Sequence, residues 1–156
     1  MSEIVILLER ARSASSVWVH PFRARSRLIR RPSVGRAVFE AAGLAEHPGI
    51  RMCDPLGYLE FMSLVRGAAA AITDSAGVQE ETTFLRVPCL TLRPVTERPV
   101  TVTSGSNRLV RADELASAVQ DALARGPYPG ELPPLWDGAS GPRIAGTIVD
   151  WLATRS

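Results

Sequence analysis

Cysteine and histidine are scarce in this sequence of 156 residues, and aromatic residues make up only 6 %. Two cysteines, Cys53 and Cys89, with no Cys-x-x-Cys pair exclude a disulfide scaffold, and only two histidines disfavour a structural zinc site. No apolar run reaches the ~20 residues that cross a bilayer, and the early apolar stretch at 4–8 lacks a preceding basic region. We therefore expect a cytoplasmic protein with no signal peptide, membrane segment, metal or cofactor.

Lysine is absent altogether, so all 18 basic residues are arginines. Residues 1–36 hold eight arginines against two acids, a net charge of +6, whereas residues 37–156 hold ten against fourteen, a net charge of −4. Such a basic start could bind nucleic acid through its phosphates, but no recognised binding module accompanies it. We expect a solvated amphipathic segment and no nucleic-acid partner.

The composition, 46 % hydrophobic and 22 % charged, is that of a single globular domain. Apolar runs alternate with amphipathic stretches, which is typical of an α/β domain with a parallel sheet. Residues 4–8 have strand composition, yet residues 4–12 could equally form a short helix. The pattern predicts strands at 17–20, 49–53, 68–73, 88–92 and 107–110. It predicts helices at 27–42, 58–66, 78–85, 112–124 and 143–153.

The most informative segment is AAITDSAGVQEET, which begins at Ala70. A buried strand ends there in a turn of small residues, and a helix follows at once. Such a turn offers free backbone N–H groups and the positive end of a helix dipole, which suits a phosphate. Ser75 adds a hydroxyl donor, while Ala76 and Gly77 let a phosphate approach the backbone. Glu81 could accept from both hydroxyls of a ribose, or simply stabilise the helix dipole.

A second polar cluster follows the next predicted strand, in LTLRPVTERP. Arg93 and Arg98 leave the end of this strand and could offer paired donors to a phosphate. Glu97 stands beside Arg98 and could instead hold it in a local ion pair. The residues alone leave both interpretations open.

Several longer motifs, in order, resemble a single family. They are DPLGYLEF at 54–61, TDSAGVQEETT at 73–83, VPCLTLR at 87–93, TERP at 96–99, GSNRLV at 105–110 and PLWDG at 134–138. From about residue 17 to 152 the chain resembles the C-terminal half of the non-hydrolysing UDP-N-acetylglucosamine 2-epimerases. The resemblance divides it into an atypical N-terminal segment, 1–16, and a UDP-N-acetylglucosamine 2-epimerase C-terminal domain, 17–156.

The resemblance implies a Rossmann-like, three-layer domain with a parallel sheet, equivalent to the C-terminal half of a GT-B fold. Members of the family interconvert UDP-GlcNAc and UDP-ManNAc without NAD or metal, by eliminating UDP and adding it back with C2 inverted. Their C-terminal domain holds the UDP. Carried onto this chain, Leu56 and Phe61 would border the uracil, Ser75, Ala76 and Gly77 would cradle the diphosphate, Glu81 would bind the ribose, and Arg98 would contact phosphate.

The sequence also departs from the family. Ala76, Arg86 and Arg111 stand where the family has glycines, and Pro94-Val95 replace a more polar pair. The chain is less than half the family's length and lacks the N-terminal domain, which carries the acid–base carboxylates. It also lacks the opening strand and histidine-bearing loop of the C-terminal domain, for which His20 and His47 are no substitute.

Two hypotheses follow from these departures. The chain contributes to epimerisation only with a separate N-terminal half, or it is a non-catalytic remnant that binds UDP or UDP-GlcNAc. Half of a glycosyltransferase shares the architecture but not the motifs. The missing opening strand would leave a sheet position exposed, which favours a homodimer. We therefore expect UDP as ligand and either a partner half or a second copy of the chain.

Overall fold

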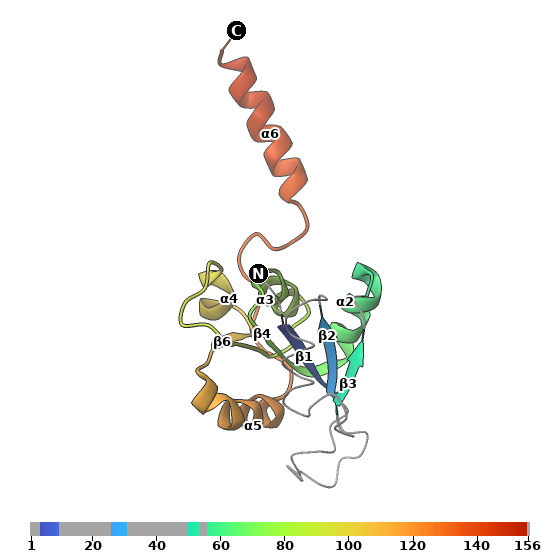
Figure 1. Ribbon diagram of the computed structural model, residues 1–156. Helices are drawn as coiled ribbons and strands as arrows, with labels where there is room; N and C mark the ends of the chain where they lie inside the picture. The colour runs from blue at the N-terminus through green and yellow to red at the C-terminus, as the bar shows by residue number, and fades with distance from the viewer. Residues whose placement is uncertain (1–3, 10–25, 31–49, 54–55, 156) are drawn as a thin grey trace.

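The computed structural model describes residues 4–9, 26–30, 50–53 and 56–155, in which strands and helices pack as a sheet covered by helices (Figure 1). The strands are β1 (Ile4–Glu9), β2 (Ser26–Arg30), β3 (Ile50–Cys53), β4 (Ala68–Thr73), β5 (Cys89–Thr91) and β6 (Asn107–Leu109). The helices are α2 (Tyr58–Gly67), α3 (Ala76–Phe84), α4 (Pro99–Thr103), α5 (Leu115–Arg125) and α6 (Ser140–Ala153). The predicted α/β class is confirmed.

Among the described side chains, apolar residues pack on both faces of β1 and β4, which gives this part of the domain three layers. Neighbouring strand residues point to opposite faces, so Leu7 and Leu8 of β1 belong to different clusters. The first cluster lies beneath α2 and α3 and consists of Leu7, Val65, Ala68, Ala71, Val78 and Val87. The second lies beneath α5 and consists of Leu8, Ala70, Ile72, Leu90, Val110, Ala118 and Ala122.

β1 settles the ambiguity of the opening segment, because residues 4–9 form a strand at the centre of the sheet. The strand order β3-β2-β1-β4-β5-β6 is that of a doubly wound fold. However, β1 runs antiparallel to both neighbours, whereas β2 pairs with β3, and β4–β5–β6 pair with one another, in parallel. The sheet is therefore mixed rather than wholly parallel, and the position we expected to be exposed is occupied by β1.

The direction of β1 decides which of its ends lies near the turn after β4. Val5 pairs with Thr73, so the amino end of β1 lies beside the carboxyl end of β4. In a parallel strand, the carboxyl end would lie there, followed by a loop that could reach a ligand. In this chain Glu9, at the carboxyl end of β1, pairs instead with Ala68 at the amino end of β4.

The helix predicted at 27–42 is wrong over its first turn, because Ser26–Arg30 forms β2. Pairing with β1 on one side and β3 on the other outweighs the helical periodicity of this segment. Residues 31–42, the strand predicted at 17–20 and both histidines lie outside the described residues. The remaining predicted elements are confirmed within one to three residues at each end. The short helix α4, which begins with Pro99 at its first position, was not predicted.

Helix α3 ends in a turn that explains why a glycine is favoured where Arg86 stands. The N–H of Val87 donates to the carbonyl of Thr82 at 2.9 Å, and the N–H of Arg86 donates to that of Thr83 at 3.1 Å. This pair of bonds is a Schellman motif, whose capping residue adopts a left-handed backbone. Arg86 has φ of +59°, a conformation that costs a residue with a Cβ atom. By contrast Arg111 has φ of −88° and carries no such cost.

Replacing Arg86 with glycine is therefore expected to stabilise the domain. Relief of the left-handed strain exceeds the entropy that glycine adds to the unfolded chain, so the net gain should be about 0.5–1 kcal/mol. Urea unfolding of Arg86→Gly measures it. Arg86→Ala is the matched control, because alanine removes the charge and keeps the strain. Equal stabilisation by alanine and glycine would show that the arginine side chain, and not its backbone, is responsible.

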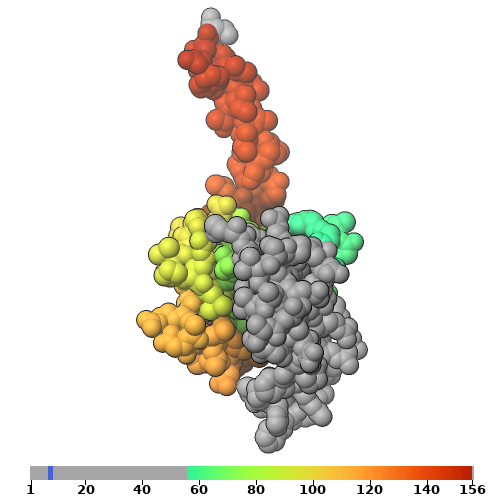
Figure 2. All heavy atoms as spheres, in the orientation of Figure 1, coloured from blue at the N-terminus to red at the C-terminus, as the bar shows by residue number. Residues whose placement is uncertain are grey.

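Helix α6 extends away from the rest of the described chain (Figures 1 and 2). Asp137 holds its beginning, accepting from the N–H of Ala139 at 2.9 Å and from the Arg143 guanidinium at 2.9 and 3.0 Å. These bonds lower the pKa of Asp137 to about 2. No residue of α6 is buried, and its exposed apolar side chains are Ile144, Ile148, Val149, Trp151 and Leu152. Among the described residues no helix is long and apolar enough to cross a membrane.

Candidate functional site

The turn between β4 and α3 has the geometry of an anion site. Ser75 is the N-cap of α3, its N–H donates to Thr73 Oγ1 at 3.0 Å, and its hydroxyl makes no capping bond within the described helix. The first-turn N–H groups of a helix have no partner inside it and carry partial positive charge. Gly77 is exposed, and a Cβ atom there would meet nothing closer than Ser75 Oγ at 4.0 Å. The first turn of α3 is thus open to a ligand.

Helix α3 begins at Ala76, two residues before the predicted start. Ser75, Ala76 and Gly77 therefore stand at the positive end of the helix itself, not in a loop before it. Ser75 is 4 % exposed and Ala76 half-buried, whereas Gly77 faces solvent. The structure brings all three predicted phosphate-binding residues to one helix terminus.

Both predicted phosphate-binding arginines are held in ion pairs. Arg98 Nε lies 3.2 Å from Glu80 Oε1, and Arg93 Nη1 lies 3.0 Å from Glu97 Oε2. The sequence left open whether these arginines bind phosphate or whether Glu97 holds Arg98 in an ion pair. Glu97 does form an ion pair, but its partner is Arg93 and not its neighbour Arg98. Arg98 and Glu80 are each more than 40 % exposed, so their pair is weak and can exchange for a phosphate.

Glu81 lies on α3 one turn beyond Gly77, beside the start of α2. Burial raises the pKa of its carboxyl, a hydrogen bond with the Tyr58 side chain lowers it in part, and the charge of Glu80 raises it. The same carboxylate raises the pKa of the Tyr58 hydroxyl. A half-buried carboxylate beside an exposed phenol can accept from a diol while the phenol offers a further donor. The sequence analysis did not single out Tyr58, although it lies within the DPLGYLEF motif.

The two predicted uracil-bordering residues differ in their surroundings. Leu56 precedes α2 and is 39 % exposed. Phe61 is half-buried and packs against the core cluster beneath α2 and α3. Helix α2 packs against α3, and it is Tyr58, the first residue of α2, whose side chain bonds Glu81.

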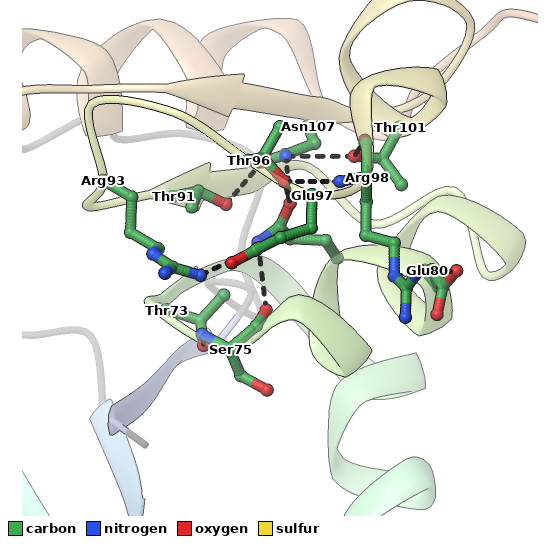
Figure 3. A network of polar contacts seen from close by, with 11 residues as sticks. Thr73, Ser75, Glu80, Thr91, Arg93, Thr96, Glu97, Arg98, Thr101 and Asn107 are labelled. Carbon is green, nitrogen blue, oxygen red and sulfur yellow. Dashed lines mark hydrogen bonds and ion pairs between the residues drawn. The ribbon is translucent and has the colours of Figure 1, made fainter. Parts of the chain in front are cut away.

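A buried network of amide and hydroxyl side chains lies beneath the site, and the sequence analysis missed it (Figure 3). Gln79 is fully buried, and its Oε1 accepts from Thr96 Oγ1 at 2.6 Å and Asn107 Nδ2 at 3.1 Å. Its Nε2 donates to the Ser75 carbonyl at 3.2 Å. The only sequence signal is spacing, since Gln79 stands four residues after Ser75 and so one helical turn below it.

The described residues offer no metal centre, because no three histidine, cysteine, aspartate or glutamate side chains among them gather around one point. Cys89 is fully buried, and burial raises the pKa of its thiol to about 11. A thiol in that state is neither a ligand nor a nucleophile at neutral pH.

The strand order is that of the doubly wound α/β domains, whose ligands sit beyond the carboxyl ends of the strands, and the turn after β4 lies at such an end. The sequence profile of the UDP-N-acetylglucosamine 2-epimerase family matches residues 4–149. This match covers most of the chain, and the chain belongs to that family.

Known relatives agree with this assignment. The UDP-N-acetylglucosamine 2-epimerase of Methanocaldococcus jannaschii is 44 % identical over 103 residues, which are 65 % of this chain and 28 % of the relative. The UDP-2,3-diacetamido-2,3-dideoxy-D-glucuronate 2-epimerase of Pseudomonas aeruginosa is 38 % identical over 92 residues, 58 % of this chain and 25 % of the relative.

Solved structures agree as well. The crystal structure of the M. jannaschii UDP-GlcNAc 2-epimerase in complex with UDP-GlcNAc and UDP superposes with a TM-score of 0.63 at 38 % identity. The superposition covers 73 % of this chain and 33 % of that one. The chain thus spans between a quarter and a third of the length of these relatives, and its fold corresponds to one domain of their GT-B architecture.

Proposed function

We propose that this chain binds the UDP moiety of a nucleotide sugar at the turn between β4 and α3. The observation that carries the proposal is the uncovered first turn of α3, where the backbone N–H groups have no partner within the helix and the exposed Gly77 lies one turn from a half-buried carboxylate, Glu81. A diphosphate fits the positive helix end, and a ribose diol fits the carboxylate one turn away. The crystal structure of the M. jannaschii relative in complex with UDP-GlcNAc and UDP supports this ligand.

The roles of the individual residues follow from their positions. Ser75, Ala76 and Gly77 hold the diphosphate, and Glu81, with Tyr58 beside it, binds the ribose. Arg98 reaches the phosphates after leaving Glu80, since an exposed ion pair costs little to break. Leu56 and Phe61 border the base. No cofactor or metal is needed for binding of this kind.

The two relatives compared above are named for different sugars, N-acetylglucosamine and a diacetamido-glucuronate. Their names share UDP and a 2-epimerase activity. All the residues to which we assign a role would contact the nucleotide, and we therefore propose UDP as the ligand. Because both relatives are named for a 2-acetamido sugar, we propose that class of sugar and no particular member of it. The cytoplasmic location of the protein stays a prediction.

Calorimetric titration of the folded chain with UDP tests the proposal. Wild type should bind, and Glu81→Ala should lose the ribose hydrogen bonds, at a cost of about tenfold in affinity. Ser75→Arg should abolish binding, because its side chain fills the space above the helix end. Glu131→Ala, which removes an equally negative but exposed loop residue, is the matched control and should bind like wild type. No binding by a folded wild-type chain, or equal binding by all variants, would refute the site.

We further propose that the chain takes part in 2-epimerisation only together with a second polypeptide that supplies the opposite wall of the cleft. The apolar face of α6 supports this, since Ile144, Ile148 and Trp151 follow helical spacing and are each more than half exposed. A helix with such a face gains stability by covering it. A complementary half of a family member is the proposed occupant, and a homodimer is the alternative outcome of the same test.

The second candidate function is binding of a UDP-sugar without catalysis. The strained Arg86 and the direction of β1, whose carboxyl end lies beside the amino end of β4, favour it. Both candidates require the same nucleotide site, and only turnover in the presence of a partner separates them.

A further inference from the structure

We propose that Gln79 is a positioning residue that couples the diphosphate turn to the loop carrying Arg98, so that the reach of Arg98 to phosphate depends on Gln79. This inference rests on the proposed UDP site and deepens it. Gln79 is the largest fully buried side chain among the described residues, and it lies between the two segments that we assign to phosphate. None of the buried side chains in the described part of the chain is charged, so hydrogen bonds decide the orientation of Gln79.

A chain of hydrogen bonds connects the N-cap of α3, through the side chain of Gln79, to the backbone of Arg98. Gln79 Nε2 donates to the Ser75 carbonyl at 3.2 Å, which holds the N-cap of α3 from below. On its other side, Gln79 Oε1 accepts from Thr96 Oγ1 at 2.6 Å. Thr96 Oγ1 in turn accepts from the backbone N–H of Arg98 at 3.0 Å. One amide thus ties the helix end to the backbone of Arg98 through a single hydroxyl.

A second set of hydrogen bonds in the same network holds the backbone carbonyl of Arg98 (Figure 3). Asn107 Nδ2 donates both to Gln79 Oε1 and to Thr101 Oγ1, each at 3.1 Å. Thr101 Oγ1 donates to the Arg98 carbonyl at 2.7 Å. Asn107 is itself held by Thr91 Oγ1, which donates to its Oδ1 at 2.7 Å. Chains of hydrogen bonds therefore link both the backbone N–H and the backbone carbonyl of Arg98 to Gln79.

Hydrogen bonds hold the backbone of Arg98, whereas its side chain is 46 % exposed and, among the ion pairs of the described residues, pairs only with Glu80. An arginine on a fixed backbone beside a helix N-terminus loses little freedom when it closes on an anion. A buried network whose hydrogen-bond donors and acceptors are all paired commonly makes a site rigid in this way.

The test separates positioning from mere stability by a ratio of affinities. UDP and uridine share the base and ribose but differ in the diphosphate, so the ratio of their affinities reports the phosphate contacts. Gln79→Met keeps the shape of the side chain and removes its three hydrogen bonds. We expect it to lower the UDP-to-uridine affinity ratio about tenfold, as Arg98→Ala should. NMR titration of folded protein measures both ligands.

A double substitution gives the decisive readout. If Gln79 acts through Arg98, adding Gln79→Met to Arg98→Ala should lower the ratio by little more than Arg98→Ala alone. Independent roles would multiply to about a hundredfold. Ala118→Gly, in α5 on the other face of the sheet, is the control for loss of stability and should leave the ratio unchanged.

If Gln79→Met does not fold, Thr96→Val tests the same link from a half-buried loop position. A wild-type ratio in the folded variant, or full multiplication in the double variant, would overturn the inference while leaving the UDP site intact. Absence of UDP binding by the wild type would instead refute the proposed function itself.

Discussion

Incubated alone with UDP-GlcNAc, the 156 residues are expected to form no UDP-ManNAc above background, and the N-terminal half of a family member should restore turnover. Elimination at C2 needs a base on one face of the sugar and stabilisation of the leaving diphosphate on the other. Of these two requirements, the proposed site meets only the stabilisation of the diphosphate. A positioned base contributes about 10²–10⁴-fold, so the difference between the chain alone and the complemented chain should be at least of that order.

Helix α6 provides the variant that links turnover to docking. Ile148→Glu places a charge within the exposed apolar face and should prevent both docking and turnover while UDP binding persists. Gly146→Glu is the matched control, because Gly146 lies on the opposite side of the helix in open space. Sedimentation measures association. A complex that forms yet stays inactive would favour the non-catalytic function, and self-association lost in Ile148→Glu would identify the homodimer as the occupant.

Gly105→Ala, in the bend between α4 and β6, is expected to destabilise the domain. A Cβ atom there would lie 2.5 Å from the Thr101 carbonyl oxygen and 2.6 Å from Thr83 Cγ2. Thr83 and Thr101 are both almost fully buried, so neither can retreat into solvent. Overpacking of this kind typically costs about 1–3 kcal/mol, which lowers the melting temperature by several degrees in a chain of this size.

Gly77→Ala is the control for that experiment, since the same methyl group there meets only open space. Its melting temperature should equal or exceed that of the wild type, because alanine is favoured over glycine in a helix. Calorimetric melting of the two variants compares them directly. Equal melting temperatures would contradict the close packing of residues 99–105 against α3.

The turn between β4 and α3 was predictable because its signals are local. A run of alanines ending at Thr73, small residues and then helix formers specify a buried strand, a turn and a helix within a few positions of one another. The same holds for α2 and α5, whose apolar spacing matches the face that they bury. For Ser26–Arg30 the local periodicity pointed to a helix, and two neighbouring strands overrode it.

The sequence by itself determined the α/β class, the place of the candidate site at the end of β4, and the family to which the chain belongs. Only the tertiary structure decided the direction of β1, the pairing of Arg98 with Glu80 and the contact of Gln79 with Asn107, 28 residues away. Backbone propensity and side-chain size act between neighbours in the chain, so a single segment reveals them. Strand direction and buried hydrogen bonds depend on which distant groups remain to be paired, and the folded chain alone brings these together.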